Sequence, residues 1–106
     1  MIIERNIPIE RTAKGEDHLC LSLVYNQQKG YYLYCYPVVL LKSPRYGSGA
    51  PPVNLGNTIS DRGMKVFVKM TSNRTQDTDE IAAKIAQNKS EWLIAMVCRK
   101  YNLRRV

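Results

Sequence analysis

The sequence predicts one α+β domain, in which an antiparallel four-stranded sheet carries a single long C-terminal helix across one face. Two patterns predict it. Three segments alternate in the way that strands do and a fourth is a long uncharged run that could be a strand, while the last quarter of the chain places apolar residues at helical spacing. The length of 106 residues suits one domain, 1–106, that buries a core of its own.

The first strand is expected at 2–11 and the second at 18–26. In the first segment Ile3, Ile7 and Ile9 share one parity. Pro8 must lie at an edge or a bulge because it cannot donate to a ladder. The second segment shows the clearest alternation, and one of its faces consists of Leu19, Leu21, Leu23 and Tyr25.

The third strand, at 30–41, holds four of the seven tyrosines, and the turn before it decides which face they occupy. If the connection is the three residues 28–30, Gln27 opposes Tyr31, and the leucines share a face with Tyr31, Leu33 and Cys35. If it is the four residues 27–30, Asn26 opposes Tyr31, and the leucines share a face with Tyr32, Tyr34 and Tyr36. Both registers stay open, although three-residue hairpins with a final glycine are a favoured type.

A long loop at 42–63 is expected before the fourth strand. It contains four of the six glycines and three of the five prolines, and a loop of this length in a compact domain is generally functional or disordered. We therefore expect a mobile loop, whose Arg45 and Tyr46 are candidates to fold over a ligand.

The fourth strand is expected at 64–70, where the residues alternate strictly. Lys65, Phe67 and Lys69 lie on one side of it, and the other side consists of Met64, Val66, Val68 and Met70.

The helix is expected from about Thr78 to Leu103, with Asp77 as its N-cap and Glu80 completing a capping-box pattern. Such a helix is about 39 Å long at 1.5 Å per residue, which exceeds the dimensions of a sheet of short strands. We expect it to overhang and to meet a second subunit through a partner interface of Trp92, Met96 and Tyr101.

The charge predicts a polyanionic partner. The net charge is +7, and between His18 and Gln76 the chain has one acid, Asp61, and seven bases. If the tyrosines and the lysines share a face, the sheet presents aromatic rings flanked by amines, which is how proteins bind single-stranded nucleic acid. The candidate nucleic-acid-binding residues are Lys65, Phe67, Lys69, Tyr32, Tyr34, Arg45 and Tyr46. The alternative function is a protein–protein interaction or a dimeric structural module.

Other classes of function have little support in the sequence. His18 is the single histidine, no C-x-x-C pair accompanies it, and no phosphate-binding or nucleophile motif occurs. We therefore expect no enzymatic activity, no cofactor and no metal. No apolar run approaches the roughly 20 residues of a membrane span, and the start has no signal-peptide core, so a cytoplasmic location is expected.

Two short patches resemble a family of small uncharacterised proteins encoded on bacterial mobile elements. They are Gly30-Tyr31-Tyr32-Leu33 with Pro37-Val38, and Leu93-Ile94-x-x-Val97-Cys98-x-Lys100-x-x-Leu103. The resemblance implies a mobile-element setting and no established activity. In that family small polar residues stand where this chain has Tyr34 and Tyr36, which implies that both positions face solvent. The order of four strands and a long helix is similar to that of Whirly-type single-stranded-DNA-binding proteins.

Overall fold

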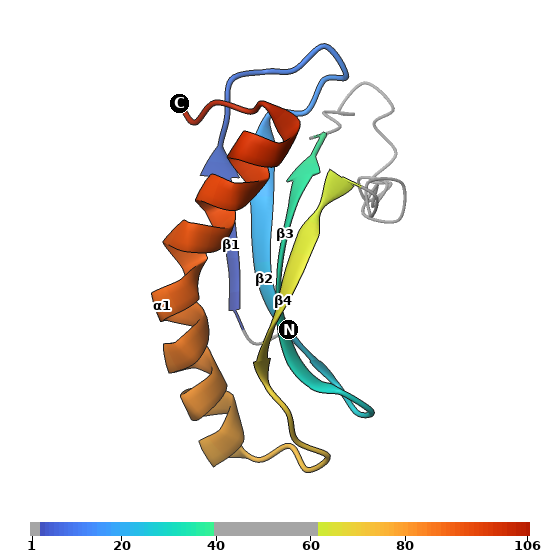
Figure 1. The fold of residues 1–106 in the computed structure, drawn as a ribbon, viewed down its shortest axis with the longest axis vertical. Coiled ribbons are helices and arrows are strands. Elements are labelled where there is room, and N and C mark those ends of the chain that lie inside the picture. Colours follow the sequence, from blue (N-terminus) through green and yellow to red (C-terminus); the bar gives the residue numbers. More distant parts are fainter. Residues whose placement is uncertain (1–2, 40–61) are drawn as a thin grey trace, which may run out of the picture.

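The computed structural model describes residues 3–39 and 62–106. Its elements are β1 (Ile3–Pro8), β2 (His18–Asn26), β3 (Gly30–Val38), β4 (Met64–Lys69) and α1 (Gln76–Tyr101). The strands form one antiparallel sheet in the order β1-β2-β3-β4, and α1 lies across one face of it (Figure 1). This confirms the predicted α+β class. Of the predicted loop, residues 42–61 lie outside the described residues.

The hairpin between β2 and β3 has a three-residue connection, 27–29, which lies one position earlier than the favoured prediction. Tyr31 therefore opposes Tyr25 rather than Gln27. The physical reason is Asn26, whose side-chain oxygen accepts hydrogen bonds from the backbone N–H groups of Gln28 at 2.8 Å and Lys29 at 3.2 Å. Because the partner of Tyr31 shifts by two positions, the faces are those of the three-residue alternative.

The core fills the face of the sheet that α1 covers, which we call the inner face. Alternate residues of β2 and β3 meet the buried side of the helix there, and the turns at its end close the cluster. The buried members are Ile7, Ile9, Leu19, Leu21, Leu23, Tyr31, Leu33, Cys35, Ala82, Ala86, Leu93, Ile94, Val97 and Leu103. Burial of these side chains is the main stabilising contribution of a domain of this kind.

The helix begins two residues earlier than predicted, and Thr75, not Asp77, is its N-cap. The Thr75 hydroxyl accepts a hydrogen bond from the Thr78 backbone N–H at 3.1 Å, and the Thr78 hydroxyl accepts one from the Thr75 N–H at 2.7 Å. Asp77 and Asp79 occupy the first turn, where the helix dipole favours acids. At the other end Asn102 adopts the left-handed conformation with φ 55°, so the helix ends at Tyr101.

The start of α1 is fastened to the sheet through Tyr31. The Tyr31 hydroxyl donates to the Asp79 carboxylate and lies 2.8 Å from the Thr78 hydroxyl. Arg74 makes a bidentate ion pair with the same carboxylate, with Nε 3.0 Å from one oxygen and Nη2 3.1 Å from the other. This network fixes the register between the helix and β3.

The C-terminal tail returns to β1. Arg105 forms an isolated bridge with Ile9, and the Glu10 N–H donates to the Arg104 carbonyl at 2.7 Å. Figure 1 shows the C-terminus beside the end of β1. Within the described part of the chain, no helix is long and apolar enough to cross a membrane.

Candidate nucleic-acid interface

The face of the sheet opposite α1, here called the outer face, carries the tyrosines that alternate with the core residues of β3. It consists of Glu4 and Asn6 from β1, Cys20, Ser22 and Val24 from β2, Tyr32, Tyr34 and Tyr36 from β3, and Lys65 and Phe67 from β4. The register thus places the predicted tyrosines and two of the predicted β4 residues on the same side.

Four of the predicted residues lie together on β3 and β4. Tyr32 opposes Phe67 and Tyr34 opposes Lys65. The Tyr32 ring centroid lies 4.8 Å from that of Phe67 and 5.9 Å from that of Tyr34. The Lys65 ammonium lies 5.3 Å from the Tyr32 ring centroid and 5.9 Å from that of Tyr34. We call Tyr32, Tyr34, Lys65 and Phe67 the aromatic cluster.

Only part of this cluster is open to a ligand. Tyr32 is buried, with 5% of its surface exposed, because its neighbours on the cluster lie around it. Phe67 is 54% exposed and Tyr34 is half-buried. Tyr32 therefore supports the rings beside it, while Phe67 and Tyr34 are the surfaces on which a base can stack.

Lys69 does not join the cluster, because β4 contains a bulge. Phe67 opposes Tyr32 while Lys69 opposes Tyr31, so Val68 is an extra residue in the β4 strand. Lys69 is therefore paired with a residue of the inner face. The alternation also fails at Met70, which was expected on the same side as Met64, Val66 and Val68 and is 80% exposed. Those three residues pack against the core.

A close backbone approach marks the position of the bulge. A Cβ atom added to Gly30 would lie 2.3 Å from the Lys69 carbonyl oxygen. Gly30 also has a φ of 97°, which side chains rarely tolerate. Only glycine therefore fits where β4 leaves the sheet.

Arg45 and Tyr46, the two predicted residues from the loop, lie outside the described residues. The four residues of the aromatic cluster all lie on β3 and β4.

Next to the cluster, the outer face is polar. The Cys20 thiol donates to a Glu4 carboxylate oxygen at 3.7 Å. Burial, and then a hydrogen bond with Cys20, raises the pKa of Tyr36 to about 12. Tyr36 is thus an uncharged phenol at neutral pH, which suits hydrogen bonding and not proton transfer.

The predicted partner interface divides into two places. Trp92 is 52% exposed and Met96 is half-buried, but Tyr101 stands nine residues after Trp92 and thus about 180° around the helix. The Tyr101 hydroxyl donates to the Gly63 carbonyl at 3.2 Å, so this side chain ties the helix to the start of β4.

Ile81 and Ile85 lie on the side of α1 that carries Trp92 and Met96. Ile81 is 47% exposed and Ile85 is half-buried. All four lie within one narrow stripe, because their spacings of four, seven and four residues are close to whole turns. We call Ile81, Ile85, Trp92 and Met96 the helix stripe. The spacing was visible in the sequence, but it does not tell an exposed stripe from a buried one.

Comparisons of this chain with protein-family models, with curated proteins and with solved structures found no match. The resemblances to mobile-element proteins and to Whirly-type folds therefore stay predictions.

Proposed function

We propose that this protein binds single-stranded nucleic acid across β3 and β4 on the outer face. The observation that carries the proposal is the Lys65 ammonium lying within 6 Å of two tyrosine ring centroids, with the exposed Phe67 ring alongside. An amine beside accessible rings is the pairing that a base and its phosphate require.

Each part of the cluster has a separate role in this binding. One base stacks on Phe67, which contributes about 1–3 kcal/mol. A neighbouring base contacts the half-buried Tyr34 ring. Lys65 attracts the phosphate between them, and its position over the tyrosines keeps the charge beside the bases. Tyr32 holds the rings in place from below.

The charge distribution favours a nucleic-acid strand that runs along β4. The overall charge of +7 attracts a polyanion. The outer face carries an acid, Glu4, on β1, which is the opposite edge of the sheet. Neighbouring β-strands are spaced about 4.8 Å apart, so Glu4 lies about 14 Å from β4. It therefore repels a nucleic acid bound along β4 only weakly.

The test is the salt dependence of binding to oligonucleotides of about 12 nucleotides. Fluorescence anisotropy with labelled single-stranded DNA and RNA would be recorded at several salt concentrations for the wild type and for Lys65→Ala. Loss of one phosphate contact should reduce the slope of log K against log salt by about 0.7. The matched control is Lys89→Ala, an exposed lysine on the helix. No binding at low salt, or an equal change in slope for both variants, would contradict the proposal.

A second candidate function, a homodimer, is favoured by the helix stripe. Its four positions are symmetric about the midpoint between Asn88 and Lys89. Two antiparallel copies of α1 related by a two-fold axis would therefore place Ile81 against Met96 of the partner subunit and Ile85 against the partner's Trp92. Aromatic residues and methionine are typical of such contacts.

The charges at the two ends of the helix are consistent with the same pairing. Asp77 and Arg99 stand 22 residues apart, about six turns, so they lie on one flank of the stripe near opposite ends. In the antiparallel dimer each would lie beside its counterpart, Asp77 near Arg99 of the partner subunit, with opposite charges adjacent.

Sedimentation equilibrium tests the dimer. Trp92→Ala should shift the chain towards monomer, whereas Val106→Ala, which truncates an exposed apolar residue away from the stripe, should not. A monomeric wild type at high protein concentration, or a dimer insensitive to Trp92→Ala, would exclude this interface.

A further inference from the structure

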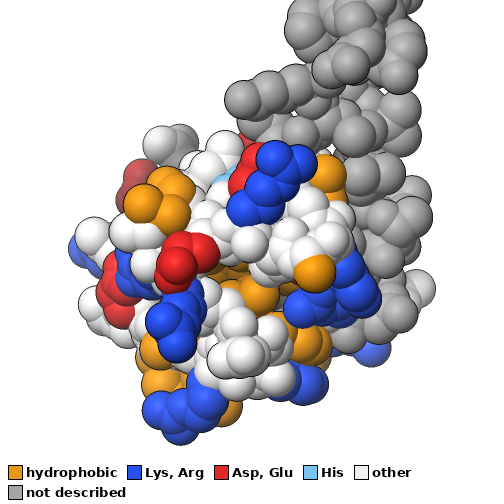
Figure 2. Space-filling model, turned by 90° about the horizontal axis from the view of Figure 1, so that it is seen from above, with side chains coloured by type: hydrophobic (Ala, Val, Ile, Leu, Met, Phe, Trp, Pro, Cys, Tyr) orange, Lys and Arg blue, Asp and Glu red, His pale blue; other side chains and the backbone are white. Residues whose placement is uncertain are grey.

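A basic pocket of about 380 Å³ lies where α1 ends, away from the aromatic cluster. Three segments far apart in the sequence form it: the connection after β1, the residue Arg62 before β4, and the chain that follows the helix. Figure 2 looks onto this end of the molecule and shows basic side chains on several sides of it. The lining residues with side-chain charges are Glu10, Arg11, Lys14, Arg62 and Arg104.

Arg62 is held rigidly in the pocket. Its Nη1 lies 2.7 Å from a carboxylate oxygen of Glu16, which is buried, and the Thr12 hydroxyl donates to the same oxygen at 3.0 Å. The guanidinium carbon also lies 5.2 Å from the Tyr101 ring centroid. A guanidinium has five N–H donors, so the bond to Glu16 leaves several for a second anion.

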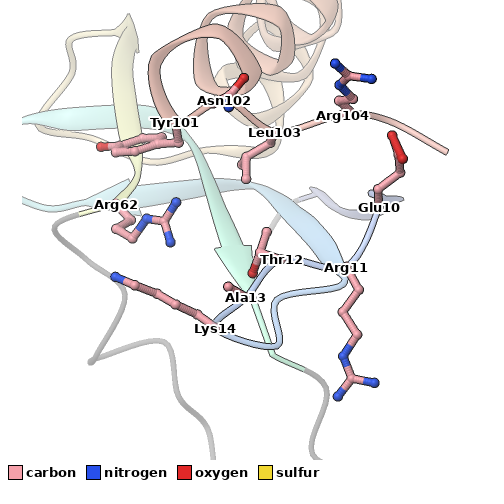
Figure 3. Close-up of a pocket in the computed structure, with 10 residues that line it drawn as sticks. All are labelled: Glu10, Arg11, Thr12, Ala13, Lys14, Arg62, Tyr101, Asn102, Leu103 and Arg104. Carbon is pink, nitrogen blue, oxygen red and sulfur yellow. The ribbon is translucent and has the colours of Figure 1, made fainter.

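Lys14 supplies a second cation from a different segment. In Figure 3 its side chain extends towards the Arg62 guanidinium. A compact turn fixes the backbone around it, since the Gly15 N–H donates to the Thr12 carbonyl and the Thr12 N–H donates to the Glu16 carbonyl, each at 2.9 Å. Lys14 and Arg62 thus both line the pocket, and Figure 3 draws them on the same side of it.

The charge around the pocket stays positive after its acids are counted. Figure 3 shows the side chains of Arg11 and Arg104 extending away from Arg62 and Lys14. Arg62 and Lys14 together, with Glu16 paired to Arg62, leave an excess of one positive charge. This charge attracts an anion with several oxygens, which could accept from both side chains.

We propose that this pocket binds a phosphate group between Arg62 and Lys14. A planar guanidinium fork beside a compact ammonium suits a tetrahedral oxyanion that accepts several charge-assisted hydrogen bonds. The group is either free inorganic phosphate or the terminal phosphate of a nucleic-acid strand, which share this chemistry. No residue of the aromatic cluster takes part, so the site does not rest on the proposed function of the outer face.

The first experiment is a titration of the full-length protein with inorganic phosphate at constant ionic strength, followed by amide NMR. Saturable shifts are expected for Thr12, Lys14 and Arg62. Lys14→Ala should weaken binding at least about tenfold, since it removes a charge-assisted hydrogen bond to the anion, and Lys14→Glu should abolish it. Lys14 is exposed, so both variants are expected to fold. The matched control is Lys89→Ala, which should bind phosphate as the wild type does.

The second experiment separates the two sources of phosphate. A 5′-phosphorylated trinucleotide would be compared with its 5′-hydroxyl form at the same amides. If the phosphorylated trinucleotide binds more tightly than inorganic phosphate, the ligand is the terminus of a nucleic-acid strand. If the phosphorylated trinucleotide and inorganic phosphate bind equally, the site recognises the phosphate group alone.

Two results would overturn the site: shifts that never saturate, or shifts that persist unchanged in Lys14→Glu. Phe67→Ala distinguishes the phosphate site from the proposed binding on the outer face. This variant should leave phosphate binding intact even where it weakens oligonucleotide binding.

Discussion

The two faces of the sheet use the same strands but have different chemistry. The inner face is aliphatic and closed, with Leu19, Leu23 and Leu33 at most 1% exposed beneath the helix. Within residues 3–39 and 62–106 no helix lies over the outer face, and on β3 and β4 this face carries rings and a lysine amine that remain partly open. The comparison indicates that the inner face provides stability, while the outer face has side chains available for a ligand.

Tyr31 and Tyr32 show this difference at adjacent positions. Tyr31 points into the core, and its hydroxyl is fixed to the start of α1 through Asp79. Tyr32 points the other way and contacts Phe67 and Lys65. The same side-chain type is thus a structural anchor on one face and a support for accessible rings on the other, because strand residues alternate.

The largest expected difference between the faces is in thiol chemistry. Burial raises the pKa of Cys35, on the inner face, to about 12 from its ordinary value of 9.0, so its thiolate population falls about a thousandfold. Cys35 should therefore be the last cysteine to react with iodoacetamide in the native protein, after Cys20 and the half-buried Cys98. Mass spectrometry of digested samples gives the order. All three should react alike in denaturant, and native Cys35 reacting as fast as Cys20 would contradict the closed inner face.

The next largest effect is on stability. Leu33→Ala should lower the free energy of unfolding by about 2–5 kcal/mol, because it removes a buried side chain and leaves a cavity. Phe67→Ala, on the outer face, should cost less than about 1 kcal/mol, since more than half of the residue is exposed. Urea unfolding measures both. Equal losses would mean that the outer face belongs to the core.

The reverse ranking is expected for nucleic-acid binding. Phe67→Ala should reduce affinity for single-stranded oligonucleotides by about 1–3 kcal/mol, or roughly 5- to 150-fold, through lost stacking. Phe67→Tyr keeps the ring and should bind nearly as the wild type does. Fluorescence anisotropy measures the affinities. If the alanine and tyrosine variants bind equally, the ring is not a stacking surface.

The sequence predicted the faces well because alternation is a local property. The second strand was placed at its observed bounds, and the favoured hairpin alternative put Tyr32 and Tyr34 on the correct side. The extra residue at Val68 escaped prediction, since Met64 to Met70 alternates without a break. A bulge depends on contacts with the partner strand, and here β4 approaches Gly30 closely. The residue pattern of β4 alone therefore does not predict the bulge.

The start of the helix was missed for a related reason. Thr75 and Asp77 are both good caps by residue type, and the capping box of Thr75 with Thr78 fixed the choice. Tyr31, which contacts Thr78 and Asp79, lies far from the helix start in the sequence. The basic pocket also joins distant segments, so no local pattern marked Lys14 and Arg62 as neighbours.

The smallest expected effect concerns the contacts of Asp79 with Tyr31 and Arg74, which hold α1 over the inner face. Hydrogen bonds from Arg74, and then from Tyr31, hold the pKa of Asp79 below its usual value of 3.8. A carboxyl group with a lowered folded-state pKa stabilises the fold above its unfolded pKa, and this contribution is lost as the pH falls through the folded pKa. Stability should therefore decline as the pH falls from about 5 towards 2.

Asp79→Asn should flatten that decline, because the amide does not titrate. The matched control is Asp77→Asn, which removes the same charge from the same helical turn but lies outside the network of Tyr31 and Arg74. Urea unfolding at a series of pH values distinguishes the two variants. A decline in Asp79→Asn as steep as that in Asp77→Asn would show that the acid sensitivity arises elsewhere. The ion pairs that Glu91 forms with Arg105 and Arg5 are the other source of such sensitivity, since they also lower the pKa of a carboxyl group.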